Sequence, residues 1–458
     1  MEKLGCKLRG YFSGTVNIIL KQILMKKKEG LKTRRRFLKT SGKAALGSTV
    51  AMNFIVPGVA RALNNDTLKV GLIGCGGRGT GAANQALKAD DNVILTAMAD
   101  VFEDRLEASL ANLKEIQGDK VQVHKKQQFS GFDAYQKVID SDVDVVILTT
   151  PPVFRPLHLE KAVAAGKHIF CEKPMAVDAP GIRRAMEASK KAREKKLSLV
   201  SGFCWRFHSP KRETFGKIRN GDIGDVHTVY NTYNTGELWS KPWQPEWSDM
   251  EKKMRNWLYY SWISGDHIVE QAIHSIDMGS WALNDMQPKS VTATGGRQVR
   301  TEEIYGNIFD HFAVVFDYEN GAKAFHFSRQ QKNCSRSYAV EMWGTQGRCV
   351  VDVIRRQHEI FGDNPWRYRG EGNDMYQQEH DELFASIRNN DPIYNGDWML
   401  QSNMMAIMGR MAAYSGQTIT YEEAWNSEEN LGPDPEDYSW ELVYEGPPVA
   451  KPGVTKFS

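Results

Sequence analysis

A glycine-rich loop near residue 75 constrains the fold more than any other feature. The apolar run 68–73 leads directly into Gly74-Cys75-Gly76-Gly77-Arg78-Gly79, within which a helical pattern begins. Glycines at the first, third and sixth positions let the backbone turn tightly and approach a pyrophosphate at a helix N-terminus. The loop therefore predicts a dinucleotide site formed by Gly74, Gly76, Gly77, Arg78 and Gly79. A purely structural glycine turn is the alternative.

The position of Asp100 indicates which dinucleotide fits. The second apolar run ends at Asp100, 21 residues past Gly79, where a carboxylate can accept hydrogen bonds from the adenine-ribose hydroxyls. The same carboxylate would repel a 2′-phosphate, so NAD is favoured over NADP. Arg78 weakens that preference, because a nearby arginine can neutralise a phosphate.

Strand and helix patterns alternate after the loop, as expected for a parallel sheet with crossover helices. Helices are expected at 101–117 and 179–195. The strands are predicted at 68–73, 93–99, weakly near Val121, 143–149, 168–171 and 198–203. This order predicts a doubly wound (Rossmann) domain.

After about residue 205 the pattern changes to short alternating runs typical of antiparallel sheets. These runs are 227–234, 290–295, 312–318, 322–328 and 338–343, followed by helical patterns at 375–389 and 399–415. The predicted fold class is α/β, with an N-terminal doubly wound domain and a C-terminal α+β domain that contains a mainly antiparallel open sheet. We expect an export signal at 1–62, the NAD-binding domain at 63–204, a substrate and oligomerisation domain at 205–428 and an extended tail at 429–458.

The N-terminal segment predicts export of the folded protein. Thr33-Arg34-Arg35-Arg36-Phe37-Leu38-Lys39 is a twin-arginine pattern, followed by a weakly apolar stretch at 44–60 and an A-x-A cleavage signal at 60–62. The apolar stretch is shorter than the roughly 20 residues that a spanning helix needs, so no stable membrane anchor is expected. We therefore expect passage through the twin-arginine machinery and a periplasmic location. A disordered basic tail is the alternative.

The charge of the mature chain argues against some partners. Residues 1–62 hold 14 Lys/Arg and 2 Asp/Glu, which leaves 45 basic and 54 acidic groups, a net charge near −9. Nucleic acids and anionic membranes require a basic face, so a small and roughly neutral substrate fits better. Five cysteines remain after the signal, with no C-x-x-C spacing, so neither a disulfide framework nor a zinc site is expected.

The segments Thr150-Pro151-Pro152-Val153-Phe154-Arg155 and Cys171-Glu172-Lys173-Pro174 resemble the glucose-fructose oxidoreductase, inositol dehydrogenase and rhizopine-catabolism family (Gfo/Idh/MocA). The resemblance spans about 68–427. It implies that Lys173 meets the substrate hydroxyl beside the nicotinamide and that Glu172 contacts the nicotinamide ribose, with Thr150, Pro151 and Arg155 completing the cofactor contacts. The family often has Asn and His at the positions of Pro152 and Arg155, which indicates a distinct subgroup. Lysine suits the role, because its ammonium can stabilise alkoxide character.

A second polar element lies at residues 265–277. On a continuous helix, Glu270, His274 and Asp277 would share one face, since their spacing is i, i+4, i+7. The resemblance implies that His274 is the general base, with Glu270 replacing the family's Asp as the group that orients it, and Asp277 is a further candidate for substrate binding. Metal binding by His267, Glu270 and His274 is a weaker alternative; we expect no metal.

Aromatic and basic residues suggest where a substrate contacts the protein. Trp205 and Arg206, just after the sixth predicted strand, are candidates for lining the cleft. Trp239, Trp243, Trp247, Trp257 and Trp262 crowd one segment, and they suit either sugar stacking or a core and interface role.

Together these features predict a periplasmic NAD-dependent oxidoreductase that acts on a secondary hydroxyl of a sugar or glycoside with tightly held cofactor. Two alternatives stay open: an NAD-dependent glycosidase that acts by transient oxidation and elimination, and a non-catalytic sugar-binding protein on the same fold. The resemblance also implies a homo-oligomer.

Overall fold

The computed structural model describes residues 66–456, so the predicted export signal at 1–62 lies outside the described residues. Within residues 66–456, no helix is both long enough and apolar enough to cross a membrane. The five cysteines in this range are free thiols, and only Cys334 is exposed.

The first sheet confirms the predicted doubly wound domain. Its strand order is β3-β2-β1-β4-β5-β6, and every neighbouring pair is parallel. The bounds are β1 (Leu68–Ile73), β2 (Val93–Asp100), β3 (Gln128–Ser130), β4 (Val145–Leu148), β5 (His168–Cys171) and β6 (Leu199–Ser201). The strand order reverses between β1 and β4, and ligands of such sheets bind at that point, beyond the carboxyl ends of the strands.

One predicted strand of this sheet is wrong. Val121 forms a single bridge to Leu95, and the third strand is the later segment 128–130. Two short 3₁₀ turns, Gly118–Lys120 and Lys125–Gln127, flank the bridge and prevent a regular ladder.

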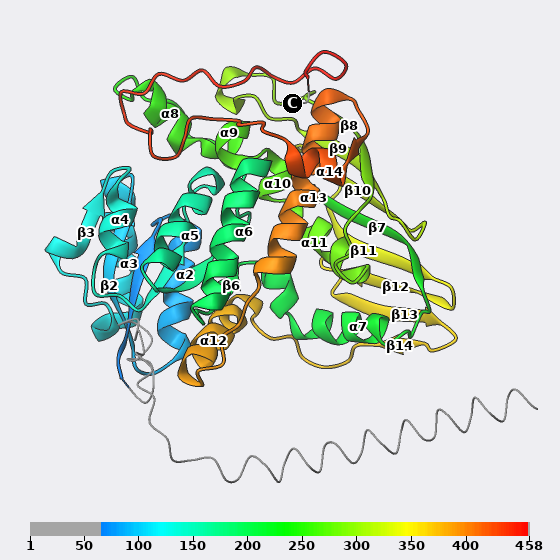
Figure 1. Cartoon of the computed structure of the whole chain (residues 1–458), viewed down its shortest axis with the longest axis horizontal. Helices are drawn as coiled ribbons and strands as arrows, with labels where there is room; N and C mark the ends of the chain where they lie inside the picture. Colours follow the sequence, from blue (N-terminus) through cyan, green and yellow to red (C-terminus); the bar gives the residue numbers. More distant parts are fainter. Residues whose placement is uncertain (1–65, 457–458) are drawn as a thin grey trace, which may run out of the picture. The chain divides into compact units, whose positions relative to one another are not determined.

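Helices cover the sheet, which is buried as a parallel sheet must be. They are α2 (Gly77–Ala89), α3 (Glu103–Gln117), α4 (Ala134–Ile139), α5 (Arg155–Ala164) and α6 (Ala179–Glu194). The start of α6 illustrates the local chemistry: the Asp178 side chain accepts a hydrogen bond from the Gly181 N–H, and Pro180 occupies the first turn. Figure 1 shows α5 and α6 standing side by side in front of the sheet.

The second sheet has nine strands in the order β14-β13-β12-β11-β7-β10-β9-β8-β15. Only β7 and β10 pair in parallel, so the sheet is mainly antiparallel, as predicted. Burial alternates along β9 and β10, which leaves one face for the core and one for solvent. The bounds are β7 (Val226–Thr235), β8 (Ser290–Gly296), β9 (His311–Asp317), β10 (Lys323–Gln330), β11 (Ser337–Gly344), β12 (Gly347–Asp352), β13 (Gln357–Gly362), β14 (Trp366–Arg367) and β15 (Ile419–Thr420).

Helices α11 (Ile273–Ala282) and α13 (Gly396–Ser415) pack on the buried face of this sheet, against β7 and β8. In contrast, α12 (Met375–Arg388) packs against α2 and the end of the first sheet. The remaining helices are α7 (Ser209–Arg219), α8 (Asp249–Arg255), α9 (Ser261–Ser264), α10 (His267–Glu270) and α14 (Tyr421–Asn426).

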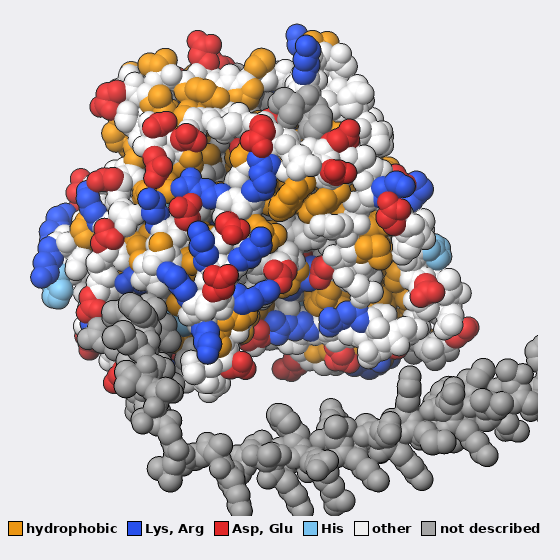
Figure 2. All heavy atoms as spheres, viewed as in Figure 1, with side chains coloured by type: hydrophobic (Ala, Val, Ile, Leu, Met, Phe, Trp, Pro, Cys, Tyr) orange, Lys and Arg blue, Asp and Glu red, His pale blue; other side chains and the backbone are white. Residues whose placement is uncertain are grey.

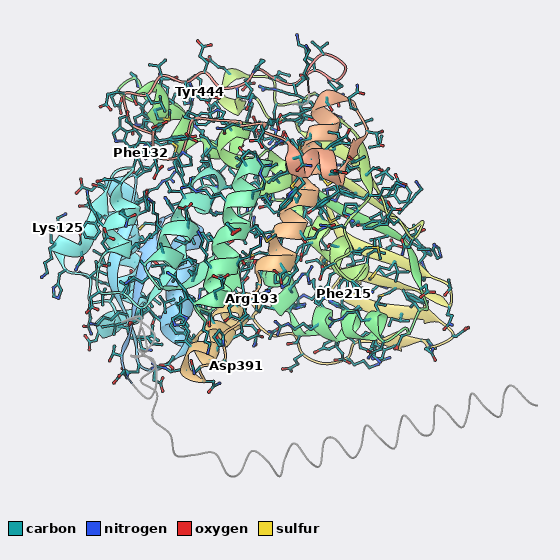
Figure 3. The ribbon with its side chains drawn as sticks, in the orientation of Figure 1. Lys125, Phe132, Arg193, Phe215, Asp391 and Tyr444 are labelled. Carbon is teal, nitrogen blue, oxygen red and sulfur yellow. The ribbon has the colours of Figure 1, made fainter. Side chains whose placement is uncertain are left out.

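The C-terminal segment after α14 is extended and runs along α8 and α9 (Figure 1). Its aromatic side chains pack on the first domain and on α9: the ring centroids of Trp440 and Phe132 are 4.8 Å apart, and those of Tyr444 and Trp262 are 5.0 Å apart. Figure 3 labels Phe132 and Tyr444 on this side of the molecule. The segment therefore fastens the two halves together.

Candidate active site

The glycine loop joins β1 to α2 and forms a cradle for a pyrophosphate. Gly74 has a φ of +99°, and a Cβ at Gly79 would lie 1.9 Å from the Gly74 carbonyl oxygen, so neither position accepts a side chain. A Cβ at Gly76 or Gly77 would meet nothing within 4 Å. The N-terminus of α2 thus faces free space with its backbone N–H groups accessible to an anion.

This loop opens into a groove of about 900 Å³ that also includes Asp100, Thr150 and Pro151. The Asp100 carboxylate accepts hydrogen bonds from the backbone N–H groups of Cys75 (2.6 Å) and Phe102 (2.9 Å), while burial raises its pKa. Two carboxylate oxygens offer more lone pairs than these bonds use, so Asp100 retains capacity for ribose hydroxyls. The cradle and the carboxylate together fit a dinucleotide.

Residues from the second half of the chain wall the same groove. Trp239, Lys241, Met254 and Trp257 line it opposite the glycine loop. The aromatic segment thus contributes to the nucleotide site, while Trp262 is fully buried in the core.

Arg255 anchors this wall to the first domain. Its guanidinium donates to Asp104 on α3 (3.1 and 3.3 Å) and lies 4.1 Å from the centroid of the Phe102 ring. Trp440 covers the same Phe102 from the C-terminal segment. Arg255 therefore holds this wall of the groove against α3 and Phe102.

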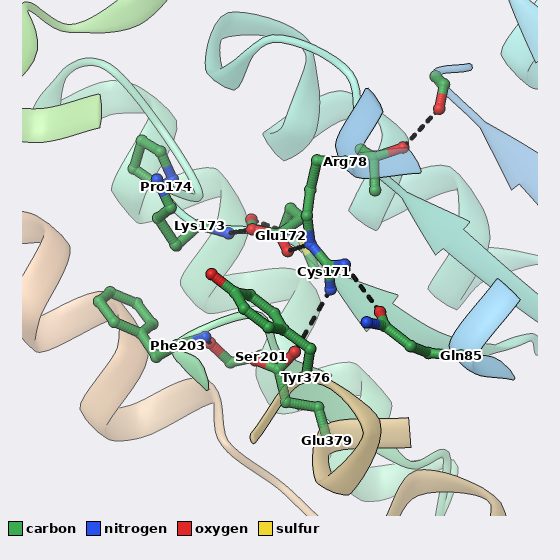
Figure 4. Close-up of polar contacts among 12 residues, drawn as sticks. Arg78, Gln85, Cys171, Glu172, Lys173, Pro174, Ser201, Phe203, Tyr376 and Glu379 are labelled. Carbon is green, nitrogen blue, oxygen red and sulfur yellow. Dashed lines mark hydrogen bonds and ion pairs between the residues drawn. The ribbon is translucent and has the colours of Figure 1, made fainter. Parts of the chain in front are cut away.

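Arg78 leaves the glycine loop to enter a network of carboxylates (Figure 4). Its Nε donates to Glu172 Oε1 (2.5 Å), and its terminal nitrogens donate to Gln85 (2.8 Å) and to Glu379 on α12 (3.4 Å). Glu379 is fully buried, and burial raises its pKa. Because Arg78 is committed to these partners, it is not free to neutralise a 2′-phosphate, which removes the main objection to NAD.

Glu172 and Lys173 follow β5 but point to different partners. Glu172 is buried against Arg78 and accepts a further bond from the Lys173 backbone N–H (3.0 Å). Lys173 Nζ donates to the Glu270 backbone oxygen (2.6 Å) and to its carboxylate (3.3 Å). The side chains of Lys173 and Glu270 are 13% and 14% exposed, so this pair is shielded from water yet reachable.

The predicted single helix face at 265–277 is wrong. The helix breaks between α10 and α11, and the cause is a contact from a distant part of the sequence: Glu270 O, which a continuous helix would offer to the His274 N–H, accepts from Lys173 Nζ instead. The His274 N–H turns to Gln271 O at 3.4 Å. As a result Glu270 faces Lys173 and does not orient the His274 imidazole through a hydrogen bond.

The His274 ring packs between the aromatic rings of Trp205 (5.0 Å between centroids) and Phe203 (6.1 Å, edge-on). Its Nδ1 is buried and has no hydrogen-bond partner within residues 66–456. Burial, followed by the positive charges of Lys173, Lys211 and Arg78, lowers the pKa of His274 well below its ordinary value. The imidazole is consequently neutral near pH 7, which is the state that a general base requires.

Asp277 and Arg206 do not act as predicted. Asp277 is 1% exposed and Arg206 is 8% exposed. Arg206 Nε donates to both Asp277 oxygens (3.0 Å each), its terminal nitrogens bind Asp285 (2.9 and 2.5 Å), and Ser402 donates to Asp277 (2.8 Å). A substrate would have to break this buried network, so the two residues hold the fold and do not offer a binding surface.

Arg155 stabilises the turn that follows Lys173, at residues 173–176. Its Nη1 donates to the Pro174 carbonyl oxygen (2.5 Å), and the side chain is 5% exposed. Asn403 on α13 supports the same turn, since its Oδ1 accepts from the backbone N–H groups of Met175 (2.6 Å) and Ala176 (3.0 Å). Arg155 was predicted to contact the cofactor, and that stays a prediction; its contact with Pro174 supports the turn that carries Lys173.

Several residues of the site carry no sequence signal. Glu379 lies 301 residues from Arg78, and Asn403 lies 228 residues from Met175. Lys211 on α7 is 2% exposed and lies 5.3 Å from the centroid of the Trp205 ring. For the metal alternative, the described range contains no group of three His, Cys, Asp or Glu placed to hold an ion, and His267 faces the core at Phe309 and Ser328.

Comparisons with known proteins agree with this geometry. The chain is 27% identical to myo-inositol 2-dehydrogenase of Thermotoga maritima over 340 residues, which is 71% of this chain and 90% of that one. It is 26% identical to inositol 2-dehydrogenase of Rhizobium meliloti over 322 residues, 70% of this chain and 86% of that one. Among solved structures, aldose-aldose oxidoreductase from Caulobacter crescentus shares the fold with a TM-score of 0.60 at 20% identity, covering 77% of this chain and 99% of that one.

Two sequence models of one family match the chain in tandem. The model described as "Oxidoreductase family, NAD-binding Rossmann fold" matches residues 68–203, and the model of the family's C-terminal domain matches residues 216–350. Together they span more than half of the chain. The protein is therefore an NAD-binding oxidoreductase that belongs to the Gfo/Idh/MocA family.

Proposed function

We propose that this protein oxidises or reduces a secondary hydroxyl-bearing carbon of a sugar or glycoside, using NAD that stays bound. The observation that carries the proposal is the orphaned His274 Nδ1 beside the Lys173–Glu270 pair at the carboxyl end of the sheet. The relatives named inositol 2-dehydrogenase support a ring alcohol as the substrate class.

NAD in the groove would supply the hydride acceptor. Neutral His274 takes the proton of the substrate hydroxyl through its imidazole. Lys173 donates to the same oxygen and stabilises its developing negative charge. Glu270 holds the Lys173 ammonium in place, and Arg155 and Asn403 hold the turn that carries it.

The second wall of the groove supports a cofactor that dissociates slowly. Trp239 and Trp257 line the nucleotide site, and Arg255 fastens their segment to α3. A retained cofactor must be regenerated in place, either by a second sugar in a ping-pong cycle or by recycling within one reaction. Arg255→Ala should therefore lose nucleotide during exhaustive dialysis. The control is Arg348→Ala on β12, which removes an arginine that stacks on Phe361 in the second sheet, and it should keep its nucleotide.

We also propose export by the twin-arginine route to the periplasm. The support is the Arg34-Arg35-Arg36-Phe37-Leu38 pattern ahead of a nucleotide-binding fold, because this route carries proteins that have already folded around a cofactor. Replacement of the arginines by lysines should trap the protein in the cytoplasm with its signal uncleaved.

We further propose that the protein assembles as a homo-oligomer through the second sheet. Tyr230 on β7 and Phe327 on the neighbouring β10 are each 37% exposed on the second sheet, and their rings lie 5.5 Å apart. Such an apolar pair supports pairing with a second copy, which sedimentation of the wild type and Phe327→Lys would test.

The decisive experiment identifies the cofactor and the substrate together. Protein purified from its native compartment is denatured, the released nucleotide is identified by mass, and a panel of sugars and glycosides is screened for a change in nicotinamide absorbance. Lys173→Ala should keep its nucleotide and lose turnover, while Lys125→Ala, an exposed lysine, should keep both. Absence of bound nucleotide with no response to added NAD would overturn the proposal, and unchanged activity of Lys173→Ala would favour a binding protein.

A further inference from the structure

A second pocket lies away from the nucleotide groove, with a volume of about 660 Å³. It is formed by the first half of α13, by α14, by α6 and by the loop at 285–287. Nothing in the proposed reaction uses it. Figure 2 shows hydrophobic side chains gathered at the surface over α13 and α14, with acidic side chains around them.

Three half-buried aromatic side chains give the pocket flat walls: Trp398, Tyr421 and Trp425. Tyr421 and Trp425 lie one turn apart on α14, and their rings are nearly parallel, with an interplanar angle of 12° and centroids 6.2 Å apart. Flat apolar faces with polar edges suit a ligand that has both C–H faces and hydroxyls.

A buried amide of the pocket has an unused donor. Gln401 is 9% exposed, and its Oε1 accepts from the Tyr421 hydroxyl at 3.1 Å. Its Nε2 is buried and has no partner among residues 66–456. Because an unpaired buried N–H is costly, this donor points to an acceptor that the folded chain itself does not provide.

The charges around the pocket argue against a strongly charged ligand. Of its three carboxylates, Asp285 is paired with Arg206 (2.5 Å) and Asp397 is paired with Arg193 (2.6 Å). Among the residues that line the pocket, only the Glu422 carboxylate has no ion-pair partner in the described part of the chain. The pocket therefore disfavours anionic ligands and has little excess negative charge to attract a cation. The paired carboxylates can still accept hydrogen bonds from hydroxyl groups.

We propose that this pocket is an accessory binding site for a neutral carbohydrate. The indole and phenol faces stack on the sugar ring, Gln401 Nε2 donates to one sugar oxygen, and the carboxylates accept from hydroxyls. The pocket is distinct from the proposed reaction site, because Lys173, Glu270 and His274 do not line it. Its Trp398 contacts His274 only through Phe203: the centroids of Trp398 and Phe203 are 5.6 Å apart, and those of Phe203 and His274 are 6.1 Å apart.

Calorimetry on the full mature protein tests this site. The probes are maltotriose, cellotriose and tri-N-acetylchitotriose as neutral ligands, with choline and trigalacturonate as charged ones. At least one neutral trisaccharide should bind the wild type and His274→Ala equally. Trp425→Ala should weaken that binding at least about tenfold, and Gln401→Leu about fivefold.

Two further measurements keep the test sharp. Retained nucleotide and an unchanged unfolding midpoint show that each variant of the pocket is folded. If Trp425→Ala does not fold, Gln287→Ala at the exposed rim of the pocket takes its place. The proposal is overturned if no neutral trisaccharide binds at millimolar concentration, if choline or trigalacturonate binds in preference, if His274→Ala alone abolishes binding, or if sedimentation shows that Trp425→Ala dissolves a dimer.

Discussion

Two ionic networks begin within seven residues of one another in the chain and have opposite character. Around Asp277 each polar group has a hydrogen-bond partner, since Arg206 donates to both Asp277 and Asp285 and the Ser402 hydroxyl donates to Asp277. Around Glu270, one lysine has one carboxylate, and the neighbouring His274 Nδ1 has no partner in the described range. A satisfied buried network stabilises a fold, whereas an unsatisfied one is costly unless a ligand completes it. The difference identifies the Glu270 side as the reactive one.

The largest effect is expected in the network around Glu270 and His274. His274→Ala removes the proposed base and should lower kcat by about 10²- to 10⁴-fold. Its Nδ1 makes no hydrogen bond to lose, so the bound nucleotide should be retained, but the lost packing against Trp205 and Phe203 should lower the unfolding midpoint. Steady-state kinetics and thermal unfolding measured on one preparation check both halves of this expectation. A variant as active as the wild type would show that another group takes the proton.

The network around Asp277 should show the opposite pattern, with a loss of stability and little change in activity. Asp277→Ala leaves the buried Arg206 Nε without its acceptor while Asp285 still neutralises the charge, so it should cost about 1–3 kcal/mol of stability. The activity per folded molecule should change far less than in His274→Ala. Denaturant unfolding gives the stability, and titration of bound nucleotide gives the number of folded molecules. A large loss of turnover with normal stability would return Asp277 to the substrate site.

Much of the fold could be predicted from the sequence, because strand periodicity and the glycine loop are local signals. β1 and β5 match their predicted ranges to the residue, and α12 and α13 lie within a few residues of theirs. The short strands β12 to β15 were missed. Val121 was misassigned because a single bridge has the same apolar pattern as a strand.

The site was less predictable, because long-range contacts decide it. Lys173 and Glu270 were both named, yet Lys173 takes the carbonyl that would have continued the helix, and no residue between 266 and 277 signals that break. Arg206 was expected in the cleft because it follows the sixth predicted strand, and Asp277 because helical spacing placed it on one face with Glu270 and His274. Only their distant partners, Asp285 and Ser402, show that they are buried.

A smaller effect should follow from Glu270→Gln. The amide keeps the shape and the backbone contact to Lys173 Nζ but loses the charge attraction across 3.3 Å. We expect kcat to fall about tenfold, about 1.4 kcal/mol in the barrier, with the unfolding midpoint unchanged. Glu270→Asp, which restores the charge one methylene shorter, should recover part of the loss. Equal defects in the two variants would mean that side-chain length, and not charge, positions Lys173.

The smallest effect concerns pH. The pKa of His274 is lowered by burial first and then by Lys173, Lys211 and Arg78. A base must be neutral, so activity should stay constant as pH falls through 6.5 and decline only at the lowered pKa. Lys211→Met removes one positive neighbour and should move this acidic limb to higher pH.

Lys217→Met, on the same helix but paired with Asp222, is the matched control and should leave the acidic limb of the activity profile in place.

The free energy of unfolding should also fall at acid pH, for the same reason. Unfolded histidines bind protons below about 6.5, whereas buried His274, His158 (pKa about 3) and His168 (pKa about 4) resist protonation in the folded state. The free energy of unfolding should therefore decrease as pH falls from 6.5 toward 4, and His274→Ala should flatten that decrease. If Lys211→Met and Lys217→Met give the same pH profile as the wild type, then the field of Lys211 does not reach the imidazole, and burial with the charges of Lys173 and Arg78 keeps His274 neutral.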